Sequence, residues 1–142
     1  APTATNPIYR MGHVLARLDA YKFPPMQNEL TRASLAVAAE SFGAEVGTSI
    51  RAFLANPRDN AAADRISTLP ELIGQVRTTC VATMLSGGHA LNALPQSAKV
   101  SVNCRIFPGI SIEETRQALE KVVEKGECRD EAQQLLNKGE AR

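Results

Sequence analysis

The feature that most constrains the fold is a segment of strict alternation between residues 98 and 106. Apolar and polar side chains take turns along it without interruption. The apolar positions are Ala98, Val100, Val102, Cys104 and Ile106, and the polar positions are Lys99, Ser101, Asn103 and Arg105. Because successive side chains of a strand point to opposite faces, the pattern predicts a strand in a sheet with one buried and one polar face.

A second strand is predicted over residues 76–85, which are rich in β-branched side chains and contain neither Gly nor Pro. Ser86-Gly87-Gly88 ends this strand. The two strands are then joined by a long hairpin loop that contains Asn92-Ala93-Leu94-Pro95.

Helices are predicted on both sides of the strand pair. Asn6 at an N-cap followed by Pro7 starts the first, which ends before Phe23-Pro24. The spacing Ser111 to Glu114 is a capping box and starts another, which Gly126 closes. A further helix is expected over residues 129–138.

Between the first helix and the first strand lies a stretch without strand alternation, predicted as a helical insert over about residues 26–73. Thr31 is a candidate cap for its first helix, and Asn56-Pro57 ends its second. At 142 residues the chain is long enough for one domain with a real core, so a single α+β domain over 1–142 is expected.

Composition excludes several functional classes. A net charge of +1 gives no reason to expect nucleic acid or an anionic membrane as partner. No window reaches the roughly 18 to 20 apolar residues of a membrane span, and no signal peptide is visible, so the compartment stays open.

The two histidines, His13 and His89, are too few for a self-sufficient metal site, and HExxH, CxxC, phosphate-loop and GxSxG motifs are lacking. No catalytic or metal-ligating residues are therefore expected in this chain.

The three cysteines, Cys80, Cys104 and Cys128, are predicted to be buried or idle free thiols. Cys80 and Cys104 fall on the two predicted strands, where they can be neighbours. Proximity of two strands does not by itself argue for a bridge, because a disulfide requires a narrow range of Cα separations.

Four segments together form one composite motif: Arg77-Thr78-Thr79, the run from Thr83 to Gly88, Asn92-Ala93-Leu94-Pro95, and the run from Val102 to Gly109. This motif resembles the lid, or dimerisation, domain of the zinc peptidase family that includes aminoacylase, acetylornithine deacetylase, succinyl-diaminopimelate desuccinylase and carboxypeptidase S. The carboxypeptidase S branch is the most similar. The resemblance is specific over residues 75–116 and looser over 6–20.

The resemblance implies a ferredoxin-like βαββαβ lid, with an antiparallel sheet, helices on one face and the flanking strands missing from this chain. In such enzymes a separate catalytic domain holds two zinc ions and the lid forms a homodimer. The parent would then be a carboxypeptidase or N-acyl amino-acid hydrolase acting on peptides or N-acyl amino acids. This chain alone is expected to hold no cofactor and to catalyse nothing.

The family's substrate-binding Asn and Arg match Asn92 and Arg105, thirteen positions apart. Gly87 and Gly88 are candidates for close backbone approach to a ligand. Each has an ordinary alternative: a solvated Arg, a turn-forming Asn and a strand-ending Gly pair. The family's lid histidine is expected before the first helix, so His89 is interpreted as an ordinary loop residue. The rival hypothesis is a non-catalytic α+β protein-interaction module that uses its sheet edge.

Overall fold

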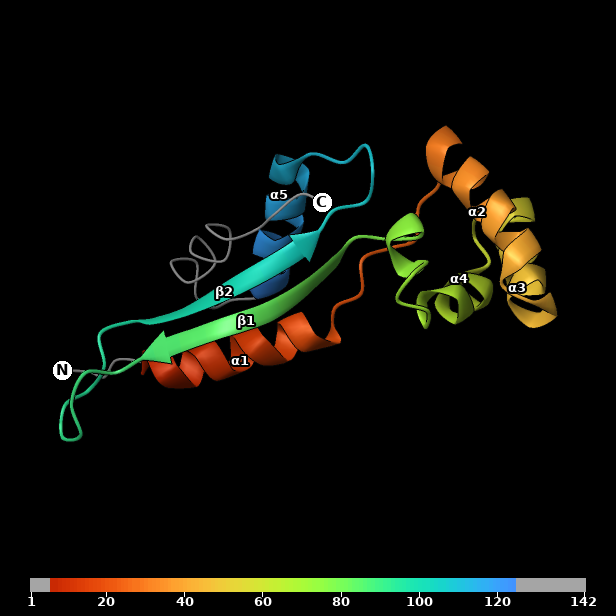
Figure 1. Cartoon of the computed structure of the whole chain (residues 1–142). Helices are drawn as coiled ribbons and strands as arrows, with labels where there is room; N and C mark the ends of the chain where they lie inside the picture. Colours follow the sequence, from red (N-terminus) through yellow and green to blue (C-terminus); the bar gives the residue numbers. More distant parts are fainter. Residues whose placement is uncertain (1–5, 125–142) are drawn as a thin grey trace. The chain divides into compact units, whose positions relative to one another are not determined.

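A computed structural model of the chain describes residues 6–124. In chain order the elements are α1 (Pro7–Ala20), α2 (Glu29–Ser41), α3 (Ala44–Ala55), α4 (Asn60–Ser67), the 3₁₀ turn η1 (Ile73–Gln75), β1 (Thr79–Gly87), β2 (Ala98–Arg105) and α5 (Ile112–Val123) (Figure 1). The predicted α+β class with an antiparallel strand pair is confirmed.

The described residues divide into two compact units. The first comprises 6–22, 80–104 and 111–124, and the second comprises 23–79 and 105–110. The second unit is wider than the insert predicted over about 26–73, because two hydrogen bonds hold residues 105–110 to it. The side-chain amide of Asn28 donates to the Pro108 carbonyl at 2.8 Å, and the backbone N–H of Phe107 donates to the Thr78 hydroxyl at 2.9 Å.

In the first unit the alternation of β2 is confirmed. Its apolar side chains are buried, whereas Lys99 and Arg105 are exposed and Ser101 and Asn103 lie between these extremes. The buried side chains share a core with Met11 and Val14 of α1 and with Leu119 and Val123 of α5, which follows from the one-sided hydrophobic pattern of each helix.

Both helices of the first unit begin where the sequence predicts. The Asn6 side chain accepts from the Ile8 N–H at 2.9 Å, and Ser111 and Glu114 form the capping box. Arg17 then ties the two helices together, because its guanidinium donates to the carbonyls of Val122 and Val123 at 3.1 and 3.0 Å. These carbonyls lie at the C-terminal end of α5, where a cation is favourable.

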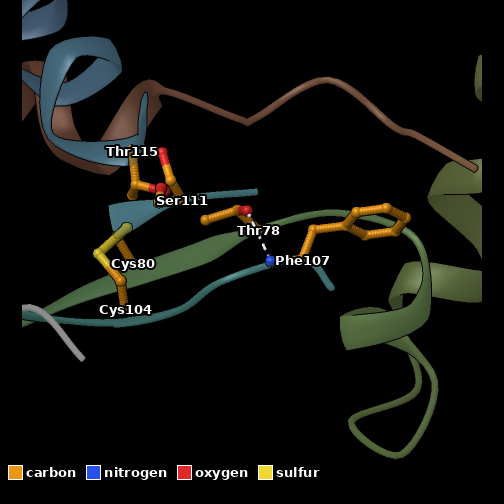
Figure 2. The surroundings of a disulfide bond; sticks show 6 residues. All are labelled: Thr78, Cys80, Cys104, Phe107, Ser111 and Thr115. Atoms are coloured by element: carbon orange, nitrogen blue, oxygen red, sulfur yellow. Dashed lines mark hydrogen bonds between the residues drawn. A yellow bond between two sulfur atoms is a disulfide. The ribbon is translucent and has the colours of Figure 1, made fainter. Parts of the chain in front are cut away.

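The prediction of free thiols is wrong for two of the three cysteines. Cys80 of β1 and Cys104 of β2 form a disulfide, with their Cα atoms 4.0 Å apart (Figure 2). Strand alternation does not reveal register, and register is what places these two side chains opposite each other.

In the second unit α2 packs on α3 and α3 packs on α4. The largest fully buried side chains of its core are Leu35, Ile50, Phe53 and Ile66. The helix predicted to start at Thr31 starts earlier, because Asn28 is the N-cap and Thr31 completes the capping box as its third residue. The prediction of Thr31 as the cap is therefore wrong by three residues.

The strand predicted from Val76 begins at Thr79. The preceding residues belong to the second unit. The guanidinium of Arg77, only 5% exposed, pairs with Asp64 of α4 at 2.9 Å. At the other end β1 continues past the predicted Leu85 to Gly87. The predictions at Gly126, Cys128 and residues 129–138 lie outside the described residues.

Candidate functional site at the hairpin

Strand β1 is exposed along most of its length. From Val81 to Gly87 every residue is exposed, including Val81 (61%), Met84 (67%) and Leu85 (60%). Among the described residues the sheet has two strands, so β1 has one edge without a partner strand. An unpaired edge presents a row of N–H and C=O groups to another chain.

An apolar groove runs beside this strand. It has a volume of about 490 Å³ and is formed by α1, the end of β1 and the start of β2. Its lining side chains include Ile8, Met11, Leu15 and Leu85. Exposed apolar side chains next to an unpaired strand edge are the combination that a stable protein contact can bury.

At the loop end of the hairpin, Gly87 and Gly88 are placed where only glycine fits well. A Cβ on Gly87 would lie 3.3 Å from the Ala98 Cβ, and Gly88 has a φ of +88°. Both glycines line a polar pocket of about 450 Å³. The close neighbour of Gly87 is Ala98 of the same hairpin, and the approach of a ligand to Gly87 and Gly88 stays a prediction.

His89 and Lys99 line the same pocket, together with Ser86, Gln96 and Ser97. The interpretation of His89 as an ordinary loop residue did not foresee this neighbourhood. The one sequence signal was adjacency to Gly87-Gly88. Lys99 is a polar position of the alternating strand, and the alternation does not indicate that it lines a pocket together with His89.

Asn92 lies in the exposed loop between β1 and β2, with Leu91 and Leu94 exposed beside it. Arg105 is the last residue of β2 and is also exposed. Neither side chain has a hydrogen bond or ion pair within residues 6–124, so no described residue competes with a ligand for them. By contrast, Arg17 and Arg77 are engaged in internal contacts.

The two predicted substrate residues lie towards opposite ends of β2. Asn92 precedes the first residue of β2 and Arg105 is its last. A strand rises about 3.3 Å per residue, so β2 alone separates its ends by roughly 20 Å. Their roles in substrate binding stay a prediction, and the separation constrains how both could serve one substrate.

Two further features of the described part of the chain bear on function. Within residues 6–124 no group of three or more His, Cys, Asp and Glu side chains is placed to hold a metal ion. No helix in that range has the length and apolar character needed to cross a membrane.

An exposed strand edge flanked by an apolar groove is what a domain needs to associate with another chain, and it defines the class: an α+β association domain. The comparison with protein families gives the class a name, because residues 1–131 match the model of the peptidase dimerisation domain of the M20 type. The chain belongs to this family of peptidase dimerisation domains. Neither the comparison with curated proteins nor the comparison with solved structures found a match.

Proposed function

We propose that this chain is the dimerisation and substrate-binding lid of a zinc-dependent metallopeptidase or amidohydrolase, either a carboxypeptidase or an N-acyl amino-acid hydrolase. Membership of the peptidase dimerisation family supports the general role. The similarity of Asn92-Ala93-Leu94-Pro95 and of the run from Val102 to Gly109 to the carboxypeptidase S branch supports the finer one. The observation that carries the proposal is the exposure of β1.

The proposed partner is a second copy of the chain. Pairing of β1 with β1 of the second copy would satisfy both unpaired edges and make a two-fold symmetric dimer, the commonest closed arrangement. The groove lined by Ile8 and Leu85 includes the end of β1 and would become buried in the same contact.

Arg105 suits a substrate carboxylate because a guanidinium is planar, permanently charged and able to donate two parallel hydrogen bonds. Asn92 offers both a donor and an acceptor, suited to a carbonyl group. Since the length of β2 separates them, one small substrate would meet Asn92 from one copy and Arg105 from the other. Dimerisation and substrate binding would then depend on each other.

Zinc belongs to this proposal only through the rest of the parent enzyme. The described residues do not fit a zinc site, since they hold no suitable ligand group. A zinc ion in the catalytic domain would supply an activated water and polarise the scissile carbonyl. The contribution of this chain is to orient the substrate through Asn92 and Arg105.

Self-association is tested with the chain alone by analytical ultracentrifugation. The wild-type chain is expected to dimerise, and Val81→Lys in β1 is expected to weaken the dimer at least tenfold, because a lysine on an edge strand opposes pairing. The matched control is Val37→Lys on α2, where the valine is 70% exposed. A dimer equally strong in both variants would rule out β1 as the contact.

The substrate role is tested in the full-length parent. Arg105→Ala is expected to lower kcat/KM about 10- to 100-fold, the effect of losing hydrogen bonds to a charged group. Arg58→Ala, at an exposed arginine in the turn before α4, is the control and should leave kcat/KM unchanged. Unchanged kcat/KM in Arg105→Ala would favour the rival hypothesis, a non-catalytic interaction module. The exposed Leu91 and Leu94 of the loop are the observation that supports this rival.

A further inference from the structure

The polar pocket at the loop end of the hairpin carries positive charge without any acid. Its lining residues are Ser86, Gly87, Gly88, His89, Gln96, Ser97, Ala98 and Lys99. Lys99 brings a cation, and His89, Gln96 and both serines bring hydrogen-bond donors. The volume of about 450 Å³ falls within the range of small-molecule sites.

The charge of this pocket does not follow from the charge of the whole chain. The whole chain is almost neutral, with a net charge of +1. The pocket between α1 and α5 is lined by Glu114 as well as by Arg17 and Lys121, so its charges are mixed. The groove beside β1 has no charged lining residue. Of these three hollows, the one at the loop end of the hairpin has a cation in its lining and no acid.

No residue in the described part of the chain competes for the His89 and Lys99 side chains. Within residues 6–124 neither His89 nor Lys99 has a hydrogen bond or an ion pair. Lys99 is fixed in position by its backbone, as the second residue of β2. His89 directly follows Gly88, whose positive φ turns the chain at the end of β1.

We propose that this pocket, which we call the hairpin pocket, binds a carboxylate, with Lys99 as the main charge partner and His89 as a hydrogen-bond donor. If the proposed lid function holds, on which this step rests, the ligand is a second carboxylate of the substrate. The hairpin pocket lies at the loop end of β2, where Asn92 also lies, and Arg105 lies at the other end. Arg105 of one copy would hold the first carboxylate and the hairpin pocket of the other copy the second. The preferred substrates are then acidic ones.

Binding is tested on the whole 142-residue chain by NMR, with a ¹⁵N-labelled sample titrated with glutarate, with its neutral analogue glutaramide and with inorganic phosphate. Saturable shifts of the amides of Gly88, His89 and Lys99 are expected for glutarate and absent for glutaramide. Lys99→Gln should weaken glutarate binding at least tenfold, whereas Lys121→Gln, in the pocket between α1 and α5, should not. Equal shifts with glutarate and glutaramide, or equal affinity in Lys99→Gln, would overturn the proposal. Tighter binding of phosphate than of glutarate would overturn the assignment to a carboxylate.

The substrate assignment is tested in the full-length parent with paired substrates: N-acetylglutamate against N-acetylglutamine, and N-glutarylalanine against N-valerylalanine. Lys99→Gln is expected to lower the acidic-to-neutral ratio of kcat/KM at least tenfold in one pair. Arg105→Ala should lower kcat/KM for both members of each pair and leave the ratio close to that of the wild type. A normal ratio in Lys99→Gln with impaired Arg105→Ala defeats the hairpin pocket alone. Full activity of Arg105→Ala defeats the proposed function, whatever Lys99→Gln does.

Discussion

At the scale of single residues, the Arg77-Thr78-Thr79 segment that resembles the peptidase family has a structural task. The Thr78 hydroxyl, buried, accepts the Phe107 N–H at 2.9 Å. Thr78→Val keeps the shape but leaves that N–H without an acceptor, so the free energy of unfolding should fall by about 1–3 kcal/mol in urea denaturation. The control is Thr83→Val, whose exposed hydroxyl makes only a 3.5 Å contact. A loss no larger than that of the control would mean that the Phe107 N–H finds another partner.

A second residue-scale prediction concerns pH. The pKa of Glu113 is held below its usual value, chiefly by hydrogen bonds from Arg116, whose Nε and Nη2 lie 3.0 and 2.7 Å from the two carboxylate oxygens. Because the pKa of Glu113 is lowered, the Glu113–Arg116 pair stabilises α5 at pH values above the usual pKa range of a carboxyl group. This contribution is lost as the pH falls through the pKa of Glu113. Arg116→Ala should raise the pKa of Glu113, measured by ¹³C NMR titration of the carboxyl group. Gln117→Ala should raise the pKa of Glu113 less than Arg116→Ala does. An equal rise in both variants would mean that Arg116 is not the main cause of the lowered pKa.

At the scale of elements, the disulfide fixes the pairing of β1 with β2. It closes a loop across a separation of 24 residues, and chain-entropy reasoning gives roughly 3 kcal/mol for a loop of that size. Replacing both Cys80 and Cys104 by Ser should therefore lower the Tm by more than 10 °C in calorimetry. A reductant such as dithiothreitol, which converts the bridge to two thiols, should act on the wild-type chain and leave the double variant unaffected. Equal Tm values for wild type and double variant would show that the bridge does not form.

The elements also show what sequence reasoning reaches. The caps at Asn6 and Ser111 and the alternation of β2 are local signals, because the interacting groups lie within a few residues, and these predictions are confirmed. The Cys80–Cys104 bridge and the Arg77–Asp64 pair depend on which distant segments meet, and no local pattern encodes that. The cap predicted at Thr31 lies at Asn28, whose side-chain amide also donates to the distant Pro108 carbonyl.

At the scale of the whole molecule, the candidate site was only partly within reach of the sequence. Asn92, Arg105 and the glycine pair were singled out by their resemblance to a known family, and their exposure agrees with a binding role without testing it. The hairpin pocket was out of reach, because residues 86–89 and 96–99 meet only when the hairpin closes. Nothing in the local sequence around Lys99 or His89 indicates that the two residues line the same pocket.

The two units should respond differently to damage in their cores. Phe53 is fully buried in the second unit (23–79 and 105–110), called here the helical unit. Leu119 is buried in the first unit (6–22, 80–104 and 111–124), called here the hairpin unit. Phe53→Ala should cost about 3–5 kcal/mol by leaving a cavity, and hydrogen exchange should show protection lost first in α2, α3 and α4. Leu119→Ala should instead loosen α1, β2 and α5.

The strength of the dimer should also differ between Phe53→Ala and Leu119→Ala. Because the proposed contact uses β1, Phe53→Ala should keep a dimer close to wild type in ultracentrifugation under conditions where the hairpin unit stays folded, and Leu119→Ala should weaken it. Uniform loss of protection in both variants, with equal loss of dimer, would mean that the units unfold as one. The helical unit would then be a required part of the dimerisation fold and not a separate elaboration beside the hairpin.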